Sequence, residues 1–127
     1  SAIILDSDYY DYLIAHTELK GELRYASADS LICLKVLAYL NLKREKEAGK
    51  HVNDYDYKKH RRDVMMAAAS LTVGEKYKVS VQLKNAITEF IEAVSEDSAK
   101  KSLIDSLKIN EEIFILYIDA LNNAFES

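Results

Sequence analysis

The stretch SLICLKVLAYLNLKREKEAG, residues 30–49, decides the fold class of this chain. Its first half is apolar almost all the way round a helix, and this pattern predicts a helical segment. Asp29 or Ser30 can cap this helix, which we expect to run through Lys46. Gly49 is positioned to end the helix in a left-handed conformation.

Lys35 lies in the apolar half of this stretch. Its neighbours three and four positions away on a helix are Leu31, Ile32, Ala38 and Tyr39, and none of them is acidic. The first interpretation is a snorkelling side chain, whose stem covers apolar surface while its amine reaches water. The second is a functional lysine, and the spacing alone does not choose between the two.

The next segment, residues 49–71, carries a clear signal for a helix start. With Asn53 as N-cap, Asp56 falls at the third helical position, so this helix should begin at Asp54. Lys59 and Asp63 form an i,i+4 pair, for which a surface ion pair is the simplest interpretation. The expected apolar face consists of His60, Val64, Ala67, Ala68 and Leu71.

Three more helices are expected further along the chain. One follows a loop at residues 72–79 and is capped by Ser80; the others cover residues 98–109 and, capped by Asn110, residues 111–125. Before residue 28, residues 2–5 predict a strand, residues 6–16 a short helix, and residues 17–26 two extended runs about Gly21. The predicted fold is mainly α (α+β): a helical bundle with a small N-terminal β element, with residues 1–127 in a single domain.

Composition favours a cytoplasmic protein. The chain has 127 residues, a net charge of −4 and one cysteine, and no apolar run is long enough to span a bilayer. A single cysteine cannot form an internal disulfide, which suits a reducing compartment. The segment from Lys35 to Arg62 holds nine Lys and Arg against four Asp and Glu. Such a basic region is typical of a site for an anionic ligand or of a solvated helix end.

Most catalytic motifs are absent from the sequence. There is no CxxC, no HExxH and no glycine-rich phosphate loop. The three histidines are too scattered to predict a zinc site, so no metal-ligating residue is proposed. Cys33 lies between apolar residues, where a cysteine usually behaves as a small core side chain.

Residues 28–71 resemble the C-terminal part of nucleotidyltransferase-like proteins related to the bacterial abortive-infection AbiEii toxin family. Those proteins carry a helix with an apolar-flanked lysine, a variable link, and a helix that opens on an R/K-D/H-x-x-D-L/V pattern. These features fall here on Lys35, and on Lys59, His60, Asp63 and Val64. The first residues also resemble members of this group, so the resemblance covers about residues 1–71.

The resemblance implies that Lys35 and Asp63 contribute to catalysis and that Lys59, His60 and Arg62 bind a nucleotide or its phosphate. His60 stands where better-known members have aspartate. The family's metal-binding glycine-serine turn and paired aspartates have no counterpart here, so the resemblance implies a fragment that holds no cofactor itself. The intact protein would use magnesium and a nucleoside triphosphate.

The partners that the resemblance implies are the missing N-terminal nucleotidyltransferase domain, a nucleotide or RNA, and an antitoxin protein; no membrane is expected. The alternative is a helical interaction module without catalysis. Its basic region would meet an acidic protein or nucleic acid, and Lys35 would only snorkel.

Overall fold

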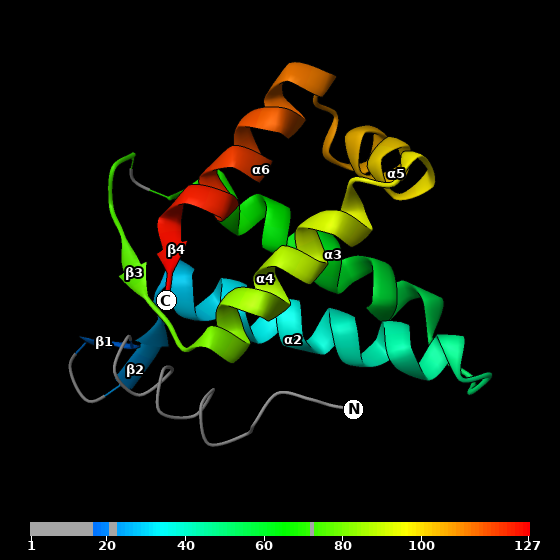
Figure 1. Ribbon diagram of the computed structural model, residues 1–127, viewed down its shortest axis with the longest axis horizontal. Coiled ribbons are helices and arrows are strands. Elements are labelled where there is room, and N and C mark those ends of the chain that lie inside the picture. The colour runs from blue at the N-terminus through cyan, green and yellow to red at the C-terminus, as the bar shows by residue number, and fades with distance from the viewer. Residues whose placement is uncertain (1–16, 21–22, 72) are drawn as a thin grey trace.

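A computed structural model of the chain describes residues 17–20, 23–71 and 73–127. The described part is mainly helical, with five α-helices, and forms a helical bundle (Figure 1). A small antiparallel hairpin precedes the bundle: β1 (Thr17–Lys20) pairs with β2 (Leu23–Ala26), with Thr17 opposite Ala26. The mainly α fold and the two extended runs are therefore confirmed. The strand expected at residues 2–5 and the short helix expected after it lie outside the described residues.

The long helix α2 covers Ala28–Glu47 and begins earlier than its sequence indicates. Its N-cap is Ser27, not Asp29 or Ser30, and the predicted cap was wrong. Asp29 and Ser30 are instead buried in the first turn, where the Ser27 hydroxyl contacts both side chains. At the other end Gly49 has φ 85°, as expected for a residue that closes a helix in the left-handed region.

Helix α3 covers Asp54–Ala68 and starts where the sequence predicts. The side chain of Asn53 accepts a hydrogen bond from the backbone N–H of Asp56 at 3.1 Å. The buried face, however, is turned relative to the expected one, because Arg61 and Met65 are buried while His60 is only half-buried. Val64, Ala67 and Ala68 are buried as expected.

The last three helices are α4 (Val81–Val94), α5 (Asp97–Leu107) and α6 (Glu111–Ala124). Ser80 and Asn110 cap α4 and α6, because their side chains accept the backbone N–H of Leu83 and Ile113. Helix α5 ends at Lys108, which takes a left-handed conformation with φ 57°. All three helices lie within two residues of their expected bounds.

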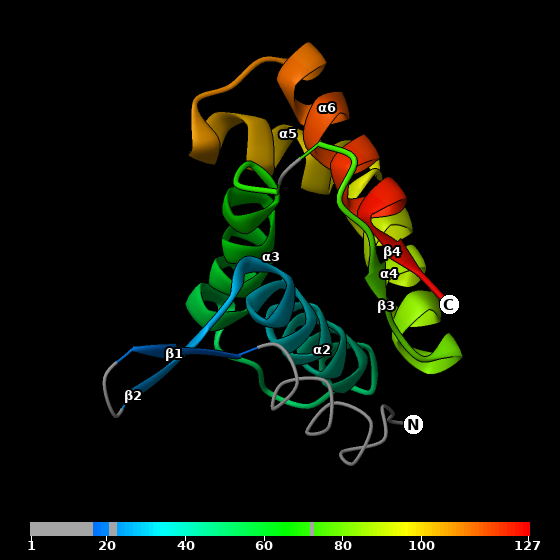
Figure 2. The same cartoon turned by 90° about the vertical axis from the view of Figure 1, so that its left-hand side faces the viewer.

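The helices pack as two pairs with α5 between them. Figures 1 and 2 show α2 and α3 side by side, with α4 and α6 against the same side of this pair. Helix α5 contacts both α3 and α4. The largest fully buried side chains come from every helix and from the C-terminal strand: Tyr39, Phe90, Phe125, Ile32, Leu40, Met65, Leu83, Ile87, Leu103, Leu121, Val36 and Val64.

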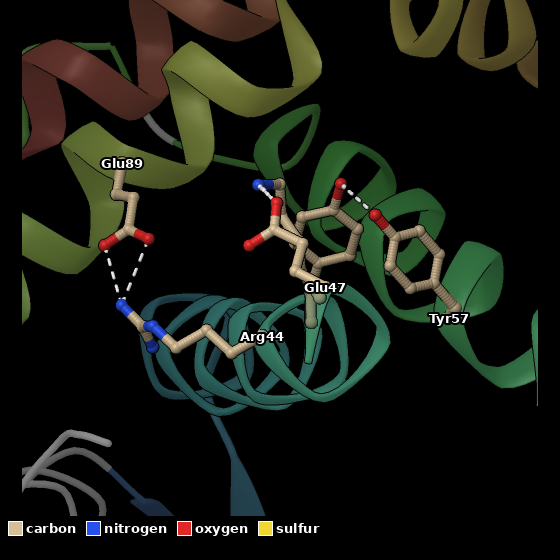
Figure 3. A network of polar contacts seen from close by, with 6 residues as sticks. Arg44, Glu47, Tyr57 and Glu89 are labelled. Atoms are coloured by element: carbon tan, nitrogen blue, oxygen red, sulfur yellow. Dashed lines mark hydrogen bonds and ion pairs between the residues drawn. The ribbon is translucent and has the colours of Figure 1, made fainter. Parts of the chain in front are cut away.

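Polar contacts hold α2 in register with its neighbours (Figure 3). Arg44 donates from one guanidinium nitrogen to both carboxylate oxygens of Glu89 on α4, at 2.9 and 3.0 Å. The hydroxyls of Tyr39 on α2 and Tyr57 on α3 lie 3.3 Å apart, with their ring centroids separated by 4.9 Å.

A short parallel pairing joins the loop before α4 to the end of the chain. Strand β3 (Tyr77–Lys78) pairs with β4 (Phe125–Glu126). Strand β3 lies in the segment that the sequence predicted to be a loop, and Phe125 was expected at the end of the last helix. Phe125 is buried under Tyr77, with the two rings tilted by 33°. None of the described helices combines the length and the hydrophobicity that a bilayer crossing needs.

Candidate functional site

The ammonium of Lys35 lies against the carboxylate of Asp63 on the neighbouring helix. Lys35 Nζ is 3.1 Å from Asp63 Oδ2, and Lys59 Nζ is 2.9 Å from the same oxygen. The side chains of Lys35 and Asp63 are 19% and 21% exposed. The charge that looks isolated on α2 therefore has a counter-charge on α3, and one carboxylate holds two ammonium groups.

Asp63 is ionised at neutral pH. Burial by itself raises the pKa of this carboxyl, but hydrogen bonds from Lys59 and Lys35 outweigh burial and lower the pKa below its ordinary value. The hydrogen bond to Asp63 in turn raises the pKa of Lys59. The cluster of Lys35, Lys59 and Asp63 thus carries one net positive charge.

His60 follows Lys59 on α3 and is neutral at pH 7. Burial lowers the pKa of its imidazole, and the positive charges of Lys35 and Lys59 lower it further. Its Nδ1 is buried and has no hydrogen-bond partner in the described part of the chain. An unpaired buried nitrogen of this kind is uncommon in folded proteins.

A pocket of about 390 Å³ opens between α3 and α5 beside this cluster. Lys59, Arg62 and Asp63 line it from α3, and Arg62 Nε donates to the hydroxyl of Ser106 on α5 at 3.0 Å. The structure therefore brings together four of the five residues named from the resemblance. Lys35, Lys59 and Asp63 are in contact, and Arg62 shares the pocket with Lys59 and Asp63. His60 is not among the residues that line this pocket.

The sequence analysis missed Arg61. Its side chain is 7% exposed, and its guanidinium donates to the hydroxyl of Ser102 on α5 at 3.0 Å. The signal was present, because Arg61 follows Tyr57 by four positions and precedes Val64 by three, which places all three on one helix face. The expected apolar face included His60 instead, and Arg61 was therefore left off it.

The described residues show no ready-made site for a magnesium ion. No group of three or more His, Cys, Asp or Glu side chains in the described ranges lies close enough to hold a metal. Asp63, the carboxylate of this cluster, already accepts from two ammonium groups. A divalent cation at that oxygen would have to displace both of them.

Comparisons with known proteins found no matching family model, no matching curated protein and no matching solved structure.

Proposed function

We propose that this chain is the helical C-terminal domain of a nucleotidyltransferase-like protein, contributing Lys35 and Asp63 to a nucleotide-phosphate site and inactive alone. The observation that supports it best is the contact of Lys35, Asp63 and Lys59 at 2.9–3.1 Å. These are the residues that the resemblance to the AbiEii-related proteins selects, and they come from two separate helices.

The chemistry of the cluster suits phosphate. Asp63 holds two flexible lysine side chains in place, so less conformational freedom is lost when a phosphate binds. The side chain of Lys35 is four-fifths buried, and a poorly solvated charge interacts more strongly with an anion than one in bulk water. Lys59 and Arg62 extend the positive surface into the adjoining pocket. Positioning and electrostatic stabilisation are the main requirements of phosphoryl and nucleotidyl transfer.

Magnesium would be held by the nucleotidyltransferase domain that the resemblance implies. The purified chain should therefore transfer no label from a radioactive nucleoside triphosphate in the presence of magnesium. Measurable transfer by the chain alone would contradict the division of labour between the two domains.

The direct test is made in a protein that contains both domains. Lys35→Ala and Asp63→Asn should each lower triphosphate turnover by about 10²-fold, the scale seen when one preorganised electrostatic contact is removed. Lys78→Ala, an exposed lysine on β3, is the matched control and should leave turnover unchanged. If the Lys35 variant is merely less stable and turns over substrate normally, Lys35 has a structural role and the interaction module is the better description.

A further inference from the structure

Arg61 is a buried cation without a buried counter-ion. It is 7% exposed, it donates a hydrogen bond to the neutral hydroxyl of Ser102, and its guanidinium carbon lies 5.9 Å from the ring centre of Tyr57. In the ranges that the structure describes, no carboxylate lies within ion-pair distance of it. A guanidinium is always charged and carries five N–H donors, so an anion that reached it could accept hydrogen bonds and neutralise its charge.

Two pockets meet at Arg61. The pocket of about 390 Å³ between α3 and α5 and a second of about 300 Å³ toward α2 share Lys58, Arg61 and Ser102 as lining residues. The two pockets adjoin at these residues and are together called the Arg61 trough. Its acidic lining residues are Asp63 and Glu96, and its cations are Lys43, Lys46, Lys58, Lys59, Arg61 and Arg62.

An aromatic side chain stands at one end of the Arg61 trough. Tyr55 lines the larger pocket and is 70% exposed, although it is a large, partly apolar residue. An exposed aromatic beside a basic groove is the arrangement on which proteins stack the bases of single-stranded nucleic acids. Guanidinium groups match phosphate oxygens with two parallel hydrogen bonds.

We propose that the Arg61 trough binds the sugar-phosphate backbone of a single-stranded nucleic acid. Arg61, Lys58 and Ser102 contact a central phosphate, the flanking cations contact its neighbours, and Tyr55 stacks on a base. Two neighbouring pockets that share one guanidinium suit a linear polyanion better than a lone phosphate. Other trough cations pair with exposed carboxylates: Lys46 and Lys58 with Asp54, and Lys43 with Glu47. Exposed ion pairs of this kind open at little cost. The trough includes Lys59, Arg62 and Asp63 of the proposed nucleotide-phosphate site. Tyr55 and Lys58, on which the test depends, do not belong to that site.

The test is fluorescence anisotropy of the full chain with a labelled ten-nucleotide single-stranded oligomer at low salt. The wild-type chain should bind, with affinity that falls as salt rises. Tyr55→Ala should weaken binding roughly tenfold, the effect of losing one stacked base. Lys58→Ala should lower the slope of log affinity against log salt by about 0.7, because one phosphate contact is lost. Lys78 lies on β3 and does not line the trough, so Lys78→Ala should change neither the affinity nor its salt dependence.

Arg61→Gln should abolish measurable binding, but loss of a buried side chain also affects folding. Tyr55 and Lys58 are exposed, so their variants keep the test independent of Arg61. The proposal is overturned if the wild-type chain does not bind the oligomer, or if the Tyr55 and Lys58 variants bind as the wild type does. It is also overturned if adenosine triphosphate, added at the same concentration of phosphate groups, competes as well as unlabelled oligomer does.

Discussion

A single carboxylate, Asp63, balances two lysine side chains at the contact between α2 and α3. Its position explains how an ammonium is accommodated on a largely apolar stretch of helix. Lys35 has no acidic neighbour on its own helix, but α3 supplies one at 3.1 Å. The pair is four-fifths buried, so water does little to replace a lost partner.

We expect Asp63→Asn to lower the free energy of unfolding by about 1–2 kcal/mol, between the values of exposed and fully buried ion pairs. The amide keeps the shape of the side chain and removes the charge that Lys35 and Lys59 contact. Urea denaturation at pH 7 measures the loss. Glu47→Gln is the matched control, because it removes an equal charge from an exposed i,i+4 pair with Lys43. It should cause no measurable change.

The ion pairs of Asp63 also predict that the free energy of unfolding depends on pH. The folded pKa of Asp63 lies below the ordinary value of 3.8, so its contribution is present above that value and is lost as the pH falls through the folded pKa. The difference in unfolding free energy between the wild type and Asp63→Asn should stay constant from about pH 7 to pH 5 and shrink below about pH 4. A difference that grows on acidification would contradict the ion pair.

The site was only partly accessible to sequence reasoning. Rules for neighbours on one helix detect Lys59 with Asp63, but they cannot detect a partner for Lys35 on another helix. The resemblance selected Lys35 and Asp63 together, and the structure places them in contact. Arg61 was missed because the expected apolar face of α3 included His60, although the spacing of Tyr57, Arg61 and Val64 places Arg61 on the buried face.

Helix ends are decided by local hydrogen bonds. The side chains of Asn53, Ser80 and Asn110 each accept a backbone N–H in the first turn of their helices. These bonds involve residues three positions apart, so their spacing is visible in the sequence. The predicted start of α2 was wrong because Asp29 and Ser30 are residue types that often cap helices, but here tertiary packing buries them.

Replacing a capping side chain should cost a measurable part of the stability. Asn53→Ala and Asn110→Ala should each lower the free energy of unfolding by about 1 kcal/mol, because a backbone N–H in the first turn loses its acceptor. The N-cap of α5, Glu96, makes no side-chain capping bond and supplies the control. If Glu96→Ala costs as much as the asparagine variants, the capping bonds are not the cause.

A substitution at the C-terminal end of α5 should raise the stability of the protein rather than lower it. Lys108 has φ 57°, a conformation that costs a side chain about 1–2 kcal/mol and costs glycine nothing. Part of that gain is lost to the greater freedom of glycine in the unfolded chain, so Lys108→Gly should stabilise the protein by about 0.5 kcal/mol. Thermal unfolding should show a raised midpoint.

The reverse substitution, from glycine to a residue with a side chain, can be made at Gly49. It has φ 85°, and an added Cβ would meet nothing within 4 Å. Gly49→Ala therefore changes backbone strain without a clash, and it should lower stability by about 1 kcal/mol. Equal effects of the two substitutions would show that left-handed geometry does not determine either helix end.

At the scale of the whole molecule, the C-terminus is held in place by segments far away in the sequence. The backbone N–H of Val79 donates to the carbonyl of Glu126 at 2.8 Å, and Lys84 Nζ donates to the carbonyl of Phe125 at 2.7 Å. The pairing of β3 with β4 was missed because each strand has two residues, too few for any alternation of polar and apolar residues. Only the packing of α6 against α4 brings the two strands together.

This closure predicts that Phe125 contributes to stability as a core residue despite its place near the chain end. Its side chain is 1% exposed and packs against the Tyr77 ring, with centroids 5.6 Å apart. Phe125→Ala should lower the free energy of unfolding by about 3 kcal/mol, through lost burial and the cavity left behind. Leu116→Ala on α6, at a side chain 60% exposed, should cost less than about 0.5 kcal/mol. Denaturant midpoints with an unchanged slope would attribute the loss to the folded state. If the two variants unfold alike, the end of the chain is frayed in solution, and the β3–β4 pairing does not hold α6 to the bundle.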